Sequence, residues 1–284
     1  MKVLSLFDGM SCGRIALDRA GIPVAKYYAS ELDQHAIKVT QANWPNTVQL
    51  GDVTKWREWD IDWSGIDLLI GGSPCQGFSF AGKQLAFDDP RSKLFFVYVD
   101  ILNHIRSLNP DVKFLLENVK MKKEHLAVIT EQLGVEPVRI NTNYIMPVNR
   151  DRFYWFSWEM GSIDSSKKKS VLELPDIGEY RPSTVKRTKE GNFVVFTENL
   201  RALTTYCEHP NGIGRPSLSL KEFEFGSRFP KGDTCKPLSP RQCEWLQTVP
   251  DGYTAHVSDI QRYKMLGNGF TVDVIAHILV SMPR

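Results

Sequence analysis

The sequence predicts an α/β protein with a doubly wound, mainly parallel sheet and a smaller inserted lobe. Short apolar segments alternate with amphipathic segments over the first 160 residues, which is the rhythm of βαβ units. Turn residues increase between residues 159 and 236, and helical spacing returns from Pro240. We therefore expect residues 1–158 and 237–284 to form the main domain and residues 159–236 to form the lobe. The 284 residues, 42% of them hydrophobic, are enough to bury a full core.

The elements of the main domain follow from apolar periodicity and from capping residues. Asp33 opens one helix, and Gly21 and Gly134 end two others. The expected strands are Val3 to Asp8, Tyr27 to Ser30, Thr47 to Leu50, Ile66 to Ile70, Val112 to Leu116 and Arg152 to Trp158. The expected helices are Ser11 to Ala20, Asp33 to Ala42, Leu94 to Ile105, His125 to Leu133, Arg241 to Gln247 and Val272 to Val280. The last two would return the chain from the lobe to the main domain.

Acidic and glycine residues follow the first three strands, at the sheet edge where doubly wound proteins bind ligands. Gly9 and Gly13 flank a tight turn into a helix, whose amino end favours a carboxylate or a phosphate. The spacing is not that of a dinucleotide site, and the glycines could serve the turn alone. Glu31 and Asp52 could hold ribose hydroxyls or could simply cap helices. Together, the three strand ends predict a cofactor that contains adenosine.

A cysteine and a glutamate follow the next two strands. Cys75 lies in the segment GGSPCQGFSF with glycines on both sides, and Glu117 begins the segment ENV. A thiolate can add to an electron-poor ring carbon, while a carboxyl group can hydrogen-bond to the ring nitrogen that collects the displaced charge. A lone cysteine can also be a small buried hydrophobe, and a glutamate can be a cap. The neighbouring strand ends favour a catalytic pair.

Composition excludes several classes of protein. Five cysteines without a CxxC spacing argue against a disulfide framework, and Cys207 with His209 has no second pair to complete a zinc site, so we expect no metal. No segment approaches the roughly 18 apolar residues of a membrane span. We expect an intracellular protein, cytoplasmic or at the nucleoid if its source is a prokaryote or a phage. With a net charge of +2, binding to nucleic acid would need a local positive field.

Eight segments resemble, in order, the motifs of the DNA (cytosine-5)-methyltransferase family. They are FDGMSCG, ELDQ, GDV, GGSPCQGFS, LLENVK, NRDRFYW, SPRQCEWLQTVPDGYT and MLGNGFTVDVIAHIL. The resemblance covers nearly the whole chain. It implies the methyltransferase fold that binds S-adenosylmethionine, a catalytic main domain and a target-recognition lobe.

The resemblance also implies roles for individual residues. Cys75 would attack carbon 6 of a flipped-out cytosine, and Glu117 would contact ring nitrogen 3 and the exocyclic amine. Arg150 and Arg152 would support the base, the loop or the DNA backbone. Val148 stands where the family commonly has glutamine, so the task of that side chain is open.

S-adenosylmethionine, with S-adenosylhomocysteine as its product, is the implied cofactor. Glu31 would hold the ribose and Asp52 the adenine amine, and Gly269 replaces the serine of many members. The full implied cofactor set is Phe7, Asp8, Gly9, Gly13, Glu31, Leu32, Asp52, Val53, Pro74, Leu94, Asn268, Gly269 and Phe270.

Double-stranded DNA is the implied partner of a chain expected to be a monomer. Residues 76–92 would form a mobile loop that closes over the DNA, although a plain surface loop has the same composition. The basic runs of the lobe would neutralise phosphates or would be solvated. The expected DNA contacts are Gln76, Ser79, Lys83, Arg91, Lys186 and Arg187.

The sequence therefore predicts a sequence-recognising cytosine-5 methyltransferase of the restriction-modification kind. Two alternatives stay open: a non-catalytic DNA-binding regulator on the same fold, and an RNA cytosine-5 methyltransferase. The DNA target and any partner nuclease do not follow from the residues.

Overall fold

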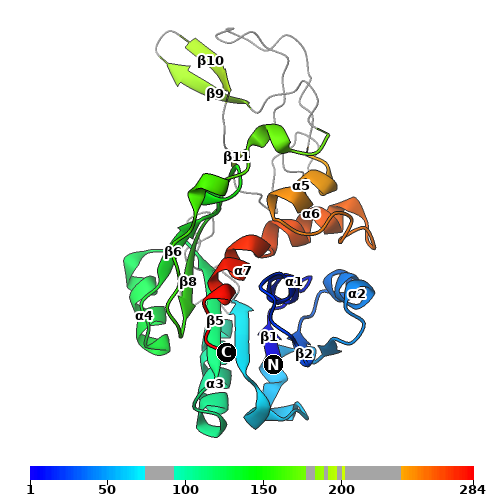
Figure 1. Cartoon of the computed structure of the whole chain (residues 1–284), viewed down its shortest axis with the longest axis vertical. Coiled ribbons are helices and arrows are strands. Elements are labelled where there is room, and N and C mark those ends of the chain that lie inside the picture. The colour runs from blue at the N-terminus through cyan, green and yellow to red at the C-terminus, as the bar shows by residue number, and fades with distance from the viewer. Residues whose placement is uncertain (74–92, 177–182, 189–190, 197–199, 202–237) are drawn as a thin grey trace. The chain divides into compact units, whose positions relative to one another are not determined.

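The protein forms two compact units in its computed structural model (Figure 1). The structure describes residues 1–73, 93–176, 183–188, 191–196, 200–201 and 238–284. The first unit comprises Met1–Asn141, Asp151–Ser162 and Val272–Arg284, and the second comprises Thr142–Arg150 and Ile163–Thr271. These bounds differ from those of the expected domains: residues 142–150 and 237–271, expected in the main domain, belong to the second unit, and residues 159–162, expected in the lobe, belong to the first. The recognition role of the lobe stays a prediction.

A seven-stranded sheet organises the first unit, in the order β3-β2-β1-β4-β5-β8-β6. Its strands are β1 Lys2–Leu6, β2 Lys26–Ser30, β3 Val48–Gln49, β4 Leu68–Gly72, β5 Lys113–Val119, β6 Val138–Asn141 and β8 Asp151–Phe156. The pairs β1–β2, β1–β4, β2–β3 and β4–β5 are parallel, whereas β8 is antiparallel to β5 and to β6. The predicted doubly wound, mainly parallel sheet is confirmed.

Helices cover both faces of this sheet. The helices of the first unit are α1 Cys12–Arg19, α2 Gln34–Asn43, α3 Lys93–Leu108, α4 Lys123–Leu133 and α7 Val272–Val280 (Figure 1). Phe95 of α3 and Ile129 of α4 join one buried cluster with Leu69 of β4. The neighbouring residue of β4, Ile70, faces the other way, because side chains alternate along a strand. There it meets α1, since a Cβ atom on Gly13 would lie 3.2 Å from the Ile70 side chain.

Three tryptophans pack beside α3. Trp56 is buried, and its ring centroid lies 5.6 Å from that of Trp63 and 5.1 Å from that of His104 in α3. Trp59 stacks on Trp63 with ring planes 10° apart. These rings extend the core on the α3 face of the sheet. In the described residues, the short 3-10 helices are Val53–Glu58, Trp63–Gly65, Thr142–Tyr144, Ser165–Lys167 and Val171–Glu173.

The described part of the second unit contains the helices α5 and α6 and short strands. Helix α5, Pro240–Leu246, begins at a capping box in which Ser239 and Gln242 exchange hydrogen bonds, and α6 spans Asp259–Asn268. The strand β7, Val148–Asn149, pairs in parallel with β11, Leu200–Arg201. A hairpin joins β9, Ser183–Thr188, to β10, Gly191–Phe196.

Several expected boundaries shift in ways that affect the site. The fourth strand runs from Leu68 to Gly72, two residues later than expected, and the fifth extends through Val119. Glu117 therefore lies inside β5, hydrogen-bonded on both sides, where its backbone is rigid. Within the described part of the chain, no helix has the length and apolar content of a membrane span.

Candidate active site

The loops that leave β1, β2, β3 and β4 emerge at one edge of the parallel sheet. The backbone N–H of Asp8 donates to Ser30 O over 3.1 Å, and that of Leu50 donates to Ala29 O over 2.8 Å. The Ser30 hydroxyl donates to Gly51 O over 2.7 Å. These bonds tie the loops of β1 and β3 to the end of β2. Residues predicted from three separate strand ends are thus held in one place.

The loop after β1 has an unusual backbone. Phe7, Gly9 and Ser11 all have left-handed conformations, with φ angles of 56°, 59° and 61°. This conformation costs a residue other than glycine about 1–2 kcal/mol, so the surrounding structure must hold it. Apart from Gly9 and its two chain neighbours, no atom of the described residues lies within 4 Å of the position that a Cβ on Gly9 would take, which leaves the backbone there open to a ligand.

Glu31 holds that loop in place. One carboxylate oxygen, Oε2, accepts from the Gly9 N–H over 2.7 Å. The other, Oε1, accepts from the N–H groups of Leu32 and Asp33 over 2.7 and 2.8 Å. Each carboxylate oxygen has two acceptor positions, so Oε2 can also accept a ribose hydroxyl. Glu31 is therefore a loop anchor in addition to any role in binding.

Asp52 lies at the next strand end and caps a 3-10 helix. Its Oδ1 accepts from the N–H and the hydroxyl of Thr54 over 2.9 and 2.8 Å. These hydrogen bonds lower the pKa of Asp52, which keeps the carboxylate ionised. Val53 beside it is buried, and Leu32 near Glu31 is 62% exposed. Two acids and an exposed apolar side chain suit the hydroxyls, amine and ring of an adenosine.

Asp8, in contrast, is buried and bonded within the protein. Its Oδ1 accepts from the Tyr27 hydroxyl over 2.7 Å, and its Oδ2 accepts from Ser11. The Ser11 hydroxyl also lies 2.9 Å from that of Thr40 in α2. Ser11 immediately precedes α1, so this cluster fixes the start of that helix. Burial raises the pKa of Asp8 to about 6, and the nearby charge of Glu31 adds to the rise.

The buried Asp8 predicts a pH dependence of stability. Between its ordinary pKa of 3.8 and about 6, the folded chain binds a proton that the unfolded chain lacks. The stabilisation from this proton is present at low pH and is lost as the pH rises through 6. For this group alone, the free energy of unfolding should fall by about 1 kcal/mol between pH 5 and pH 7.5.

Urea unfolding of the wild type and of Asp8→Asn at the two pH values measures this effect. The variant has no carboxyl group to titrate at that position. Its stability relative to the wild type should therefore rise by about 1 kcal/mol from pH 5 to pH 7.5. A difference that is the same at both pH values would contradict the prediction.

Glu117 and Arg152 form an ion pair on adjacent strands. The Arg152 Nε atom lies 2.9 Å from Glu117 Oε1, and the two side chains are only 17% and 10% exposed. Gly72 of β4 lies opposite Glu117 on the other side of β5. Because β5 pairs at Glu117 with β4 on one side and with β8 on the other, the backbone that carries the carboxyl group has a fixed position. Among the described residues, Glu117 Oε1 has no hydrogen-bond partner although it is buried, so the contact with Arg152 is purely electrostatic.

Ser73 connects the end of β4 to β5. Its hydroxyl accepts from the Asn118 side chain over 3.0 Å, and both residues are buried. Ser73 is two residues before Cys75. The predicted residues Pro74, Cys75, Gln76, Ser79, Lys83 and Arg91 lie outside the described residues, as do Cys207 and His209. Sequence reasoning missed Ser73 and Asn118, although both flank the segments that it identified.

Arg150 has different surroundings from Arg152. It belongs to the second unit, is buried, and donates to the carbonyl oxygens of Gly267 and Gly269 over 3.0 and 2.8 Å. Asn268 is the last residue of α6, and Gly269 and Phe270 follow it in the turn between α6 and α7. The structure thus places Arg150 against predicted cofactor residues of its own unit. Leu94 lies in the first turn of α3, and Lys186 and Arg187 lie in β9, where only the backbone is described.

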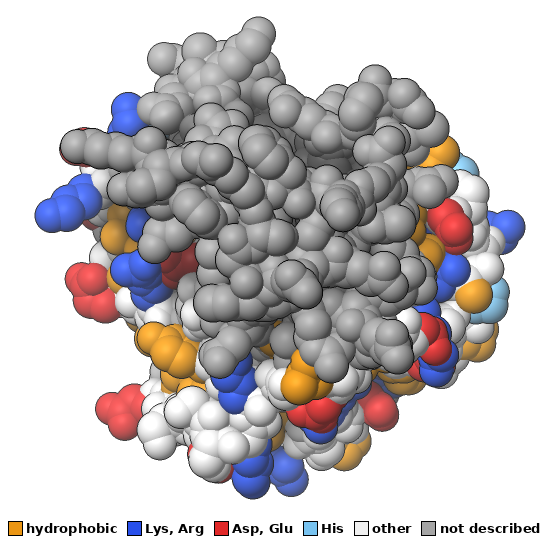
Figure 2. All heavy atoms as spheres, turned by 90° about the horizontal axis from the view of Figure 1, so that it is seen from above, with side chains coloured by type: hydrophobic (Ala, Val, Ile, Leu, Met, Phe, Trp, Pro, Cys, Tyr) orange, Lys and Arg blue, Asp and Glu red, His pale blue; other side chains and the backbone are white. Residues whose placement is uncertain are grey.

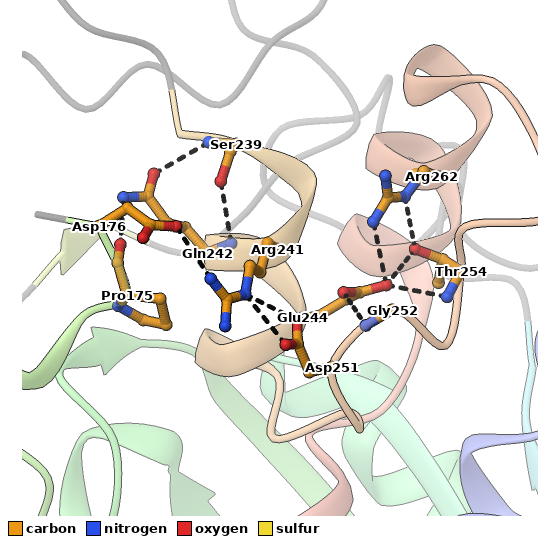
Figure 3. A network of polar contacts seen from close by, with 10 residues as sticks. All are labelled: Pro175, Asp176, Ser239, Arg241, Gln242, Glu244, Asp251, Gly252, Thr254 and Arg262. Carbon is orange, nitrogen blue, oxygen red and sulfur yellow. Dashed lines mark hydrogen bonds and ion pairs between the residues drawn. The ribbon is translucent and has the colours of Figure 1, made fainter.

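A second polar network organises the segment SPRQCEWLQTVPDGYT (Figure 3). Glu244 is fully buried and accepts from the N–H groups of Gly252 and Thr254 over 2.9 and 2.8 Å. Arg262 of α6 pairs with it at 3.3 Å. Arg241 pairs with Asp251 at 2.9 Å. The signal for this network was an acid inside an apolar helix, just before a Pro-Asp-Gly turn.

The charges on the described surface are mixed. Figure 2 shows lysine and arginine side chains interspersed with aspartate and glutamate around the face that it presents. Among the residues that the structure describes, no group of three or more histidine, cysteine, aspartate or glutamate side chains is arranged to hold a metal ion.

Known proteins resemble this chain over nearly its full length. The model of the family described as "C-5 cytosine-specific DNA methylase" matches residues 1–170 and 157–284. The type II methyltransferase M1.ScrFI of Lactococcus lactis subsp. cremoris is 30% identical over 99% of this chain and 77% of its own length. The type II methyltransferase M.NlaX of Neisseria lactamica is 28% identical over 99% and 96%.

A solved structure shows the same fold. The S. pombe Dnmt2 methyltransferase superimposes with a TM-score of 0.67 at 18% identity, over 99% of this chain and 97% of that one. The sheet order, the site at the carboxyl edge and these matches agree. The chain belongs to the C-5 cytosine-specific DNA methylase family.

Proposed function

We propose that the chain transfers a methyl group from S-adenosylmethionine to carbon 5 of cytosine in duplex DNA, through a transient bond between Cys75 and carbon 6. One observation carries this proposal: the Glu117 carboxyl group is fixed by Arg152 at 2.9 Å, on the strand beside β4. Ser73, held by Asn118, begins the segment that leads to Cys75. Two residues of extended chain span at most about 7 Å, which supports a thiol near the carboxyl group.

The residues have distinct roles in this mechanism. The Cys75 thiolate forms a bond to carbon 6, and the electrons of the 5,6 double bond move toward carbon 5 and the ring. Glu117 acts in its protonated form: its hydroxyl donates to ring nitrogen 3 and its carboxyl oxygen accepts from the exocyclic amine, which stabilises the displaced charge. Carbon 5 then takes the methyl group. A base, for which a water molecule suffices, then takes the carbon 5 proton, and the electrons of that C–H bond re-form the 5,6 double bond as the bond from carbon 6 to sulfur breaks and releases the Cys75 thiolate.

Arg152 prepares Glu117 for this task. The guanidinium charge lies 2.9 Å from Oε1 in an ion pair that is not an aligned hydrogen bond, and its attraction holds the Glu117 carboxyl group at the end of β5. Two side chains with fixed geometry need little reorganisation when charge develops on the ring. A cytosine inside a duplex cannot reach this site, so the base must be extruded at a cost of a few kcal/mol.

The residues at the carboxyl edge fit S-adenosylmethionine, which supplies an activated methyl group when bound. Glu31 would accept from the ribose, Asp52 from the adenine amine, and Leu32 would cover the ring. The open backbone at Gly9 leaves room for the ligand. The family resemblance adds Phe7, Gly13, Val53, Pro74, Leu94, Asn268, Gly269 and Phe270. Asp8 supports this site from within the protein, where its carboxyl group accepts hydrogen bonds from Ser11 and Tyr27.

Recognition of a specific sequence, by the lobe and by residues 76–92, completes the proposal. The DNA contacts expected of Gln76, Ser79, Lys83, Arg91, Lys186 and Arg187 belong to it. The proposal also includes action as a monomer inside the cell, where the DNA lies.

Transfer of labelled methyl groups from S-adenosylmethionine to a pool of duplex DNA, with transfer RNA as the competing acceptor, tests the function. We expect labelled DNA, with the methyl group on cytosine carbon 5 at a recurring sequence in bisulfite sequencing. Transfer to transfer RNA alone would establish the RNA methyltransferase instead. DNA binding without transfer to either acceptor would establish the non-catalytic regulator.

A further inference from the structure

Gln247 has a buried side-chain amide whose nitrogen and oxygen both make hydrogen bonds. It follows α5 directly and is 1% exposed. Its Nε2 donates to Leu266 O over 2.7 Å, and its Oε1 accepts from the Thr271 hydroxyl over 2.7 Å. The side chain therefore spans the turn between α6 and α7, bonding to a residue on each side of Asn268, Gly269 and Phe270.

Residues at the ends of the two chain segments that form the second unit also hydrogen-bond to this turn. Arg150 donates to Gly267 O and Gly269 O, and the Thr142 hydroxyl lies 3.1 Å from that of Thr271. The Thr142 N–H also donates to Arg150 O over 2.9 Å. Thr142, Arg150 and Thr271 are each the terminal residue of a segment of this unit. Hydrogen bonds thus join two of these ends, Thr142 and Arg150, to the turn that contains the third, Thr271. Gln247 bonds to the same turn.

Other features of this cluster make Gln247 difficult to replace. A buried amide that loses its partners costs about 1–3 kcal/mol, and a carboxylate could not donate to Leu266 O. Asn268 is exposed and Phe270 is half-buried, so the turn presents side chains while its backbone is fixed from within. The arrangement suits a backbone that must keep one conformation for a ligand.

We propose that Gln247 is a positioning residue that fixes the Gly267–Thr271 turn in the conformation used for binding S-adenosylmethionine. The inference rests on the proposed function, in which Asn268, Gly269 and Phe270 contact the cofactor. It also connects the cofactor site to helix α5. Helix α5, whose segment resembles the one that organises DNA recognition, would control the cofactor site through its last turn.

A matched pair of variants separates positioning from stability. Gln242 is also a buried amide of α5: its Nε2 donates to Pro175 O over 2.7 Å and its Oε1 accepts from the Ser239 N–H over 2.9 Å (Figure 3). Gln247→Met and Gln242→Met each remove both hydrogen bonds while keeping an unbranched side chain of similar volume. Both should lower the urea midpoint by similar amounts.

Only Gln247→Met should weaken cofactor binding. In calorimetry with S-adenosylmethionine and the full chain, we expect its Kd to rise about tenfold, equivalent to about 1.4 kcal/mol. The Kd of Gln242→Met should stay within about twofold of the wild type. Binding of Gln247→Met to duplex DNA should also change by less than about twofold. Equal changes in cofactor Kd for the two variants, or none for Gln247→Met, would overturn the inference.

A second pair of variants applies if Gln247→Met does not fold. Thr271→Val removes the hydroxyl group that donates to Gln247, and Thr271→Ser keeps it. The valine variant should bind the cofactor more weakly and the serine variant should restore binding; equal binding by both would overturn the inference. Failure of the proposed function has a different signature, because the wild type itself would then neither bind S-adenosylmethionine nor transfer its methyl group.

Discussion

Cys75→Ala abolishes methyl transfer in the mechanism proposed above, while cofactor binding stays intact. Without the thiolate, carbon 5 of cytosine is not nucleophilic enough to take the methyl group, so the rate should fall by a factor on the order of 10⁴ or more. The measurement is transfer of labelled methyl groups to duplex DNA under single-turnover conditions. Calorimetry with S-adenosylmethionine should give the same Kd for variant and wild type within about twofold.

Cys243→Ala is the matched control for this variant. Cys243 is a fully buried thiol of α5, so its removal changes packing without removing the proposed nucleophile. It should cost some stability and leave the rate of transfer within about threefold of the wild type. Undiminished transfer by Cys75→Ala would refute the covalent mechanism.

Glu117→Gln should slow transfer by about 10²–10⁴, with little change in fold. The amide has the shape of the carboxyl group but cannot supply a proton to ring nitrogen 3. It also replaces the charged partner of Arg152 with a neutral one, which weakens the 2.9 Å contact that orients the side chain. Because the defect lies in the chemical step, it should appear in the single-turnover rate.

Glu124→Gln provides the comparison for Glu117→Gln. Glu124 is exposed in the first turn of α4 and lies outside the proposed site. Its substitution should leave the single-turnover rate and the Kd for S-adenosylmethionine unchanged within about twofold. Equal rates for Glu117→Gln and the wild type would exclude Glu117 from the chemistry.

The sheet could be predicted because its strands are apolar runs separated by clear helix signals. Val3 to Leu6 and Ile66 to Ile70 have no other reasonable place than a buried parallel sheet. Because parallel strands end at the same edge of the sheet, the positions of Glu31 and Asp52 after two such strands were enough to predict that both lie at that edge. The same logic placed Glu117 beside the strand that leads to Cys75, which the pairing of Gly72 with Glu117 confirms.

Other elements escaped prediction for physical reasons. The buried residues of helix α6, which are Tyr263, Met265, Leu266 and Gly267, all lie after its first turn, so its sequence DIQRYKMLGN shows little apolar periodicity. Strand β6 is four residues long and lies at the end of the strand order, paired with β8. A strand this short gives little apolar alternation to recognise.

Polar contacts within the site were also beyond the sequence. That Asp8 bonds to Tyr27 and Ser11, or that Arg150 holds the turn after α6, depends on residues up to 119 positions apart. A motif shows which residues are present but not which partner each one takes. Arg150 and Arg152 therefore appeared equivalent in the sequence, and the structure gives them different partners.

Trapping the covalent bond tests the central claim most directly. In duplex DNA that carries 5-fluorocytosine, carbon 5 cannot lose a proton after methylation, so the bond between Cys75 and carbon 6 cannot be released by elimination. With S-adenosylmethionine, we expect a protein–DNA complex that survives denaturing electrophoresis, with the methylated base attached to the peptide that contains Cys75. No stable complex on DNA that is methylated when it carries ordinary cytosine, or attachment to another residue, would contradict the account.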